Sequence, residues 1–128
     1  MKDGMKDGGA GADPRLEKGR ALFNAGRFFE AHDAWEELWR EAVGPRRTFL
    51  QGLIQIAAGF LKDQRGAPES AARLLEMGLE KLGSGAAPAG ALRDFAAAVD
   101  DVARLRRGGG AAHRGDPYPL LPPLDGVK

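Results

Sequence analysis

The sequence contains no cysteine among its 128 residues, which excludes disulfide bridges and thiolate metal sites. It also has no apolar run of about 18 residues, so no segment is expected to span a membrane. Residues 1–12 are rich in Lys, Asp and Gly and have no hydrophobic segment, so we do not expect a signal peptide. A soluble, cytoplasmic protein without membrane contact is the expectation that follows.

Excess charge of either sign is also absent. Lys and Arg number 19 against 18 Asp and Glu, giving a net charge of +1. This balance argues against a nucleic-acid partner bound through bulk charge. Val, Ile and Tyr are scarce while Ala, Leu and Arg are common, which favours helix over sheet.

Apolar residues at helical spacing, separated by Gly and Pro, predict an all-α protein that forms a single compact bundle of about five helices. The third helix, about Pro45 to Gln64, is the most apolar and is expected to be central. The expected helices span about 13–25, 28–43, 45–64, 68–82 and 88–106. Residues 1–12 are predicted to be a disordered tail, 13–107 the helical bundle domain, and 108–128 a Gly hinge with an extended, Pro-rich tail that packs on the bundle or docks on a partner.

The stretch from Phe23 to Phe60 holds both tryptophans, five of six phenylalanines and one of two histidines. Within the second expected helix, one face is predicted to be buried by helical spacing: Phe28, His32, Trp35, Glu36, Trp39 and Val43. Gly19, Gly52 and Gly59 have no side chain, so each is expected to allow another helix to approach closely.

His32 and Glu36 lie one helical turn apart on this face, so their side chains can meet. A buried carboxylate is costly unless it is paired. Three interpretations remain open: a pair that satisfies itself in the core, part of a pocket for a small molecule or a partner, or a metal or catalytic site.

A metal site would lack ligands if these helices are placed as predicted, and we expect no cofactor. Asp33 and Glu37 are expected on other faces, and His113 lies in the tail. The Glu-x-x-His and His-Glu-x-x-His spacings of metal-binding helices are absent.

Gln51 and Gln55 complete a polar pocket with His32 and Glu36 if the second and third helices pack as a hairpin. Otherwise they lie on a half-exposed face. The candidate ligand-binding pocket is therefore His32, Trp35, Glu36, Trp39, Gln51 and Gln55.

Two groups of arginines can be explained without a binding site. Arg46 and Arg47 open the third helix and are expected to pair with Glu41 or Glu37, with anion recognition as the alternative. Arg104, Arg106, Arg107 and Arg114 have no interleaved aromatic residues, so we interpret them as a solvated helix end rather than a nucleic-acid site.

Two pieces of the sequence resemble the bacterial family called domain of unknown function 309. They are Asn24-x-Gly26-x-Phe28-Phe29-Glu30-Ala31-His32-x-x-x-Glu36-x-x-Trp39 and Gly44-Pro45-x-Arg47-x-Phe49-Leu50-Gln51-Gly52-Leu53-Ile54-Gln55. The resemblance covers the first three helices, the fourth more loosely, and neither tail. It implies a small, soluble, bacterial all-helical bundle with no established activity. Its motif residues are His32, Glu36, Trp39, Gln51, Gly52 and Gln55.

We therefore expect a non-enzymatic binding or interaction module with a polar pocket around His32 and Glu36. Its partner is an unknown small molecule or protein. One alternative is a metal-dependent or hydrolase-like enzyme that uses His32 and Glu36. The other is a purely structural role for the pair, with function in self-association as a homo-oligomer.

Overall fold

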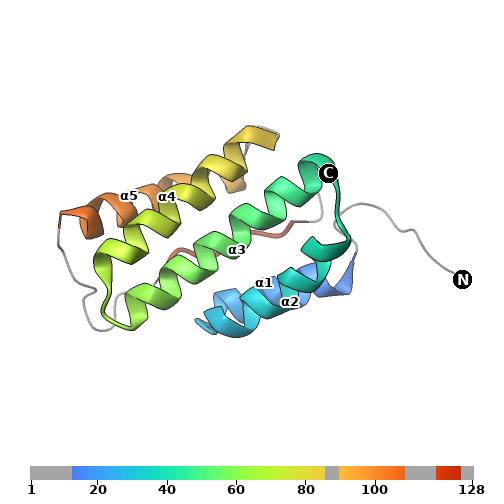
Figure 1. Cartoon of the computed structure of the whole chain (residues 1–128), viewed down its shortest axis with the longest axis horizontal. Coiled ribbons are helices and arrows are strands. Elements are labelled where there is room, and N and C mark those ends of the chain that lie inside the picture. The colour runs from blue at the N-terminus through green and yellow to red at the C-terminus, as the bar shows by residue number, and fades with distance from the viewer. Residues whose placement is uncertain (1–12, 86–89, 109–117, 125–128) are drawn as a thin grey trace, which may run out of the picture.

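The computed structural model describes residues 13–85, 90–108 and 118–124. These residues form five α-helices and confirm the all-α bundle (Figure 1). None of the helices among them has the length and hydrophobicity that a membrane span requires. The helices are α1 (Pro14–Asn24), α2 (Phe28–Glu41), α3 (Gly44–Gln64), α4 (Pro68–Gly85) and α5 (Ala91–Arg107).

Local signals set most of the helix ends. The Asp13 side chain accepts a hydrogen bond from the Arg15 backbone N–H at 2.9 Å, as expected of an N-cap. Gly26 and Gly66 follow α1 and α3 with φ of 79° and 80°, a backbone conformation that residues with side chains rarely adopt.

Some helix ends differ from those that the sequence predicted. Helix α2 ends at Glu41, earlier than the expected Val43, and α4 continues to Gly85, past the expected end before Gly83. The expected start of the last helix at Pro88 lies outside the described residues. So do the expected tail at 1–12 and most of the Gly hinge.

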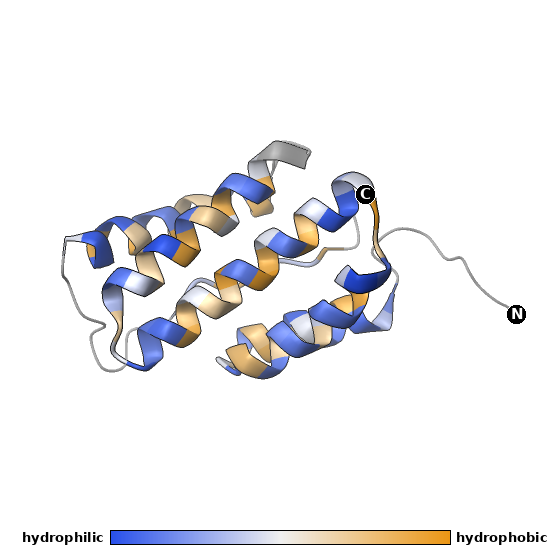
Figure 2. Ribbon diagram, in the orientation of Figure 1, coloured by the Kyte–Doolittle hydropathy of each residue, from blue (hydrophilic) through white to orange (hydrophobic). Residues whose placement is uncertain are grey.

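Helix α3 lies between two helical hairpins. Helix α2 packs on one side of it and α4 on the other, while α1 packs on α2 and α5 on α4 (Figure 1). In Figure 2 the helices carry hydrophobic positions on one side and hydrophilic positions on another. Leu50, Leu53, Ile56 and Phe60 of α3 are all buried, which confirms its central place.

Small residues bring α3 and α4 together, as the two glycines of α3 predicted. A Cβ on Gly52 would lie 2.8 Å from the Gly78 carbonyl oxygen, and one on Gly78 would lie 2.7 Å from the Gly52 carbonyl oxygen. A Cβ on Gly59 would lie 2.7 Å from Leu75. All three contacts are shorter than a side chain allows, so the two helices approach closely at these glycines.

We call residues 118–124 the strap; this segment runs without regular secondary structure across the bundle, behind α3 in the view of Figure 1. Its Leu121 and Leu124 are buried. The amide of Asn24 holds Leu121 at both backbone groups, because its Oδ1 accepts from the Leu121 N–H at 2.7 Å and its Nδ2 donates to the carbonyl at 3.0 Å. Of the two predicted outcomes for the Pro-rich tail, the strap therefore shows packing along the bundle.

A buried ionic group fastens the start of the strap at Tyr118. Arg106 donates from Nε to the Asp63 carboxylate at 2.6 Å, and the Tyr118 hydroxyl donates to the same carboxylate at 2.8 Å. Only 4% of Asp63 and 7% of Arg106 are exposed. The prediction that Arg106 belongs to a solvated helix end is therefore wrong, whereas Arg104 and Arg107 are exposed and pair with Asp100 and Glu76.

Candidate functional site

Helix α2 buries a different face from the one its spacing predicted. Its buried residues are Phe28, Ala31, Trp35 and Leu38. The side chains of His32 and Glu36 are 29% and 34% exposed, so the expectation that both lie in the core is corrected. Val43 is 79% exposed because α2 has already ended. The rotation arises because α2 packs against α1 as well as against α3.

Trp35 lies apart from the rest of the predicted pocket. Its indole is fully buried, and Nε1 donates to the Leu16 carbonyl of α1 at 3.1 Å. Gly19 provides the space for it, because a Cβ there would lie 2.2 Å from the indole nitrogen. Trp35 therefore fixes α1 to α2 and does not belong to the candidate site.

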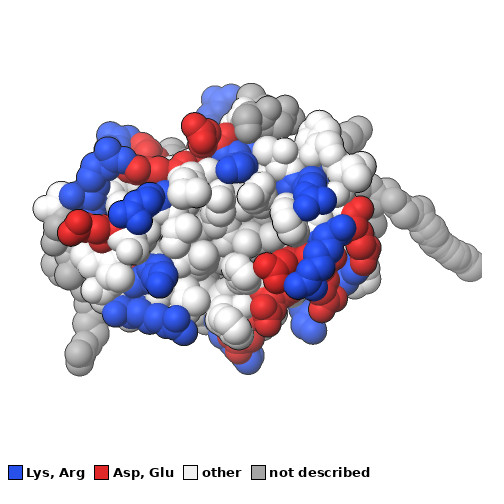
Figure 3. Space-filling view, viewed as in Figure 1, with Lys and Arg blue, Asp and Glu red and all other residues white. Residues whose placement is uncertain are grey.

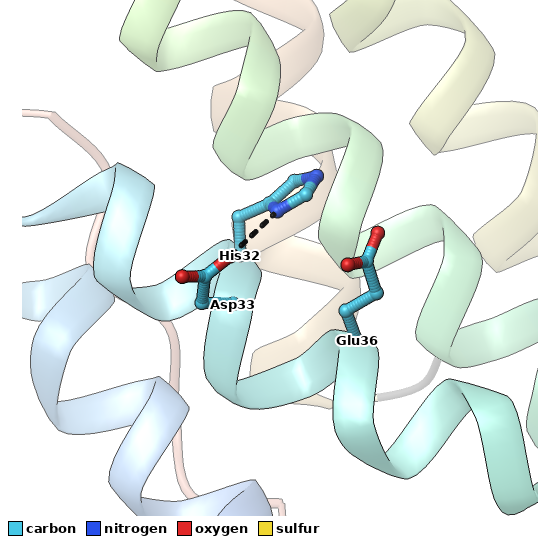
Figure 4. A group of neighbouring side chains, drawn as sticks. All are labelled: His32, Asp33 and Glu36. Carbon is cyan, nitrogen blue, oxygen red and sulfur yellow. Dashed lines mark ion pairs between the residues drawn. The ribbon is translucent and has the colours of Figure 1, made fainter.

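His32, Asp33 and Glu36 form a cluster on one turn of α2. Each offers one ligand atom, and these atoms lie within 4.8 Å of one another. Figure 4 shows the His32 ring and the Glu36 side chain extending together from α2, with the Asp33 carboxylate beside the imidazole. His32 Nδ1 is 3.9 Å from Asp33 Oδ1. The expectation that Asp33 points to another face is therefore wrong, since its carboxylate turns back toward the histidine.

Trp39 carries a cation on its face. The Arg47 guanidinium carbon lies 3.9 Å from the centre of the Trp39 ring, a cation–π contact between α3 and α2. No carboxylate in the described part of the chain pairs with Arg47. Glu41, one of its two expected partners, is instead held by Arg15, and that hydrogen bond lowers the pKa of the Glu41 carboxyl.

The Trp39–Arg47 contact sets the register of the antiparallel α2–α3 hairpin. His32 lies two helical turns before Trp39 along α2. Ile54 lies the same number of residues after Arg47 along α3, and Gln55 follows it. We call the surface between these levels, from Trp39 and Arg47 to His32 and Ile54, the α2–α3 seam. Gln55 borders the seam on the side away from α2, because it shares a side of α3 with Gly52 and Gly59, which face α4. Glu36 and Gln51 lie at intermediate levels of the same seam.

Three side-chain atoms in or beside the seam are buried without a hydrogen-bond partner. They are His32 Nδ1, Trp39 Nε1 and Gln55 Oε1, and among the described residues they are the only buried side-chain nitrogen or oxygen atoms in this state. Most buried polar atoms in proteins are paired, so each exception calls for an explanation. Here all three exceptions fall on residues that the sequence had singled out.

Charge is distributed unevenly around the seam. Figure 3 shows an uncharged area over the middle of the face on which α3 lies, with acidic and basic side chains at its edges, closely mixed along α2. Glu36 takes part in this edge, because its Oε1 accepts from Arg40 at 3.1 Å.

Asp63 and Asn24, the two side chains that hold the strap, were not predicted from the sequence. Asp63 had a signal, since it continues the buried spacing of Leu53, Ile56 and Phe60 along α3. Asn24 opens the first of the two pieces that carry the family resemblance, but its spacing did not mark it as a partner of the strap. A surface pocket of about 230 Å³ lies where the strap meets the end of α1, lined in part by Phe23, Asn24, Tyr118 and Leu120.

The α2–α3 seam lies within the part of the chain that matches a known family. Residues 16–74 match the model of a family described as Domain of unknown function (DUF309), which bears out the resemblance on α1 to α3. Neither the curated proteins nor the solved structures contain a match to the chain.

Proposed function

We propose a function from the geometry of the α2–α3 seam. The match of residues 16–74 to the DUF309 family supplies none, because the function of that family is unknown. The protein is a non-enzymatic binding module, and the seam receives a small polar ligand. The observation that carries the proposal is the set of three buried, unpartnered polar atoms, His32 Nδ1, Trp39 Nε1 and Gln55 Oε1.

An unpaired buried polar atom destabilises a fold by about 1–3 kcal/mol, the penalty of removing it from water. Three such atoms on two adjoining helices therefore lower the stability of the fold, and a purely structural role does not explain them. Binding sites are where proteins retain groups of this kind, because the ligand supplies the missing partners. The half-exposed His32 and Glu36 beside them give a ligand a way in from solvent.

The chemistry of the seam specifies the ligand class. Trp39 Nε1 is a donor without an acceptor, and Arg47 beside it is a cation without a carboxylate in the described structure. Both favour a carboxylate on the ligand. Gln55 Oε1 is an acceptor, so a ligand amine or hydroxyl suits that end. The two ends lie two helical turns apart, about 11 Å. A small molecule that carries its carboxylate and its hydrogen-bond donor at opposite ends of a chain, such as an amino acid with a long polar side chain, fits both ends.

The first test is stability. We expect Gln55→Met to raise the free energy of unfolding by about 1 kcal/mol, because it removes a buried acceptor that has no partner. Chemical denaturation without ligand measures the change. The matched control is Gln64→Met on the same helix, whose amide donates to the Gly26 carbonyl and whose loss should lower the stability slightly. If Gln55→Met destabilises the fold as well, Gln55 is structural and the proposal loses its main support.

The second test is binding. Amino acids and small carboxylates are titrated while the tryptophan emission is followed, and we expect a saturable change below about 1 mM, the weak end of specific affinity. Gln55→Met and Trp39→Phe should abolish it. No saturable change with any of these compounds, in a protein that is folded, would contradict the proposed ligand class.

A further inference from the structure

We propose that the surface under the strap is a binding groove for a Pro-rich peptide segment of a partner protein, which takes the place of the strap. We call this surface the strap groove. The side chains that hold the strap in it are Arg20, Asn24, Phe28, Phe60 and Asp63. The strap groove shares no residue with the α2–α3 seam, so this binding site is independent of the proposed function.

Contact between the strap and the bundle repeats every third residue. Tyr118 packs on the aromatic core, and Leu121 and Leu124 are 1% and 2% exposed. Between them, Leu120 and Pro123 are exposed. A polyproline II helix has three residues per turn, so every third side chain lies on the same side of it. Three of the seven strap residues are proline, and the strap therefore presents one side of a polyproline II segment to the groove.

The groove holds the strap by its backbone at Leu121. The Asn24 amide accepts from the Leu121 N–H at 2.7 Å and donates to the Leu121 carbonyl at 3.0 Å. Arg20 Nε donates to the same carbonyl at 3.0 Å. These three hydrogen bonds use no side-chain atom of the strap, so they suit any residue other than proline at this position. Recognition of this kind fits an extended peptide of another protein as well as it fits the strap.

The start of the groove selects a tyrosine. The Tyr118 ring packs against Phe28 and Phe60, and its hydroxyl donates to Asp63 at 2.8 Å. Aromatic-lined grooves are common docking sites for Pro-rich segments, which lose little conformational freedom when they bind. The partner segment therefore carries a tyrosine, leucines at the third and sixth positions after it, and prolines between them.

Two observations favour a strap that can be exchanged. Asn24 and Asp63 lie within residues 16–74, which match the family model, whereas the strap lies outside the match. The groove thus belongs to the matched domain and its occupant does not. In addition, the surface pocket of about 230 Å³ is lined by Tyr118 and Leu120, so the strap leaves part of this end unfilled. A partner segment with a larger side chain at the position of Leu120 gains contact there.

The strap competes with any external peptide because it is part of the same chain. A tethered segment has an effective concentration in the millimolar range. The apparent affinity for an external peptide is lowered to the extent that the strap fills the groove. Substitutions that loosen the strap and leave the groove intact should therefore strengthen the binding of an external peptide.

The test uses the full chain and a fluorescent peptide with the sequence of residues 117–124, whose binding is followed by anisotropy. We expect Leu121→Ala to bind the peptide at least about tenfold more tightly than the wild type, because its own strap loses a buried anchor. Leu120→Ala, which changes the neighbouring exposed leucine, is the matched control and should stay within about twofold of the wild type. Adding Asn24→Ala to Leu121→Ala should weaken binding at least about tenfold, because the groove loses two hydrogen bonds to the peptide backbone.

Tyr118→Phe provides a milder second variant, since it removes only the hydrogen bond to Asp63. It keeps the fold if Leu121→Ala does not, and it should strengthen peptide binding about threefold or more. Circular dichroism verifies that each variant is folded. Absence of saturable binding to the folded strap variants, or the same affinity as in the wild type, would mean that the strap is a fixed part of the fold and would overturn the proposal. A wild-type dimer that becomes monomeric in Leu121→Ala, measured by sedimentation, would identify the occupant as the strap of a second copy and would also overturn it.

Discussion

Trp35 and Trp39 lie four residues apart on α2 and have opposite surroundings. The Trp35 indole is fully buried and its nitrogen donates to the Leu16 carbonyl, so the residue is satisfied within the fold. Trp39 is half-buried under Arg47, and its nitrogen has no partner. The structural and the candidate binding tryptophan therefore differ in burial and in whether the indole nitrogen has a partner, although both indoles pack against the core.

Tyr118 offers a test at the scale of one residue. Burial and its hydrogen bond to Asp63 raise the pKa of its hydroxyl above the ordinary value of about 10. The folded state thus holds this proton more tightly than the unfolded state does. The resulting stability is fully present below about pH 10 and is lost as the pH rises through the higher pKa of the folded state.

Tyr118 is the one tyrosine of the chain, so the ultraviolet absorbance of tyrosinate reports its ionisation alone. We expect the native protein to ionise above pH 10 and the denaturant-unfolded protein to ionise at about pH 10. The Tyr118→Phe variant should lack this contribution to the alkaline loss of stability. Ionisation of the native protein at the same pH as the unfolded chain would show that the strap does not hold Tyr118 against Asp63 in solution.

The α3–α4 pair packs through close backbone approach at its glycines. Gly52 and Gly78 face each other, and each leaves room for the carbonyl of the other. Close approach of this kind strengthens dispersion contacts, because atoms at van der Waals distance replace voids. It also makes the pair intolerant of any added side-chain atom.

We therefore expect Gly78→Ala to destabilise the protein by about 1–3 kcal/mol, since the new Cβ would lie 2.6 Å from Ile56 Cγ1 and 2.7 Å from the Gly52 carbonyl oxygen. Gly83, also within α4, has nothing within 4 Å of the corresponding position. Gly83→Ala should be neutral or stabilise by up to about 1 kcal/mol through helix propensity. Thermal unfolding of both variants measures the contrast, and similar effects of the two substitutions would contradict the close α3–α4 contact.

Across the whole molecule, the strap joins helices that are distant in the sequence. Its middle bonds to Asn24 of α1 through Leu121, and its first residue, Tyr118, bonds to Asp63 of α3, the partner of Arg106 of α5. The Tyr118 ring also packs edge-on against Phe28, with 5.3 Å between ring centres, and tilted against Phe60, with 4.8 Å between them. The strap therefore extends the aromatic core to which α1, α2 and α3 contribute.

Two neighbouring leucines of the strap make this testable. Leu121 is 1% exposed and Leu120 is 68% exposed. Leu121→Ala should lower the free energy of unfolding by about 2–5 kcal/mol, as expected of a buried leucine. Leu120→Ala should change it by less than about 0.5 kcal/mol. Denaturant unfolding gives both values, and equal effects would mean that the strap is not docked.

The sequence alone was sufficient for the all-α class, the order of the helices and the central place of α3. These follow from local causes: apolar spacing along each helix, Asp13 as an N-cap, and Gly and Pro at the ends. Gly19, Gly52 and Gly59 also predicted close packing, because a residue without a side chain in a helix commonly marks a contact.

Only the tertiary structure decided which way each helix faces its neighbours. Spacing gave the same face to His32 and Trp35, but packing against α1 buried Trp35 and left His32 at the α2–α3 seam. The burial of Arg106 likewise depends on Asp63, which is 43 residues away in the chain. Such contacts are non-local, so their free energy depends on which side chains meet in space and not on any spacing within one helix.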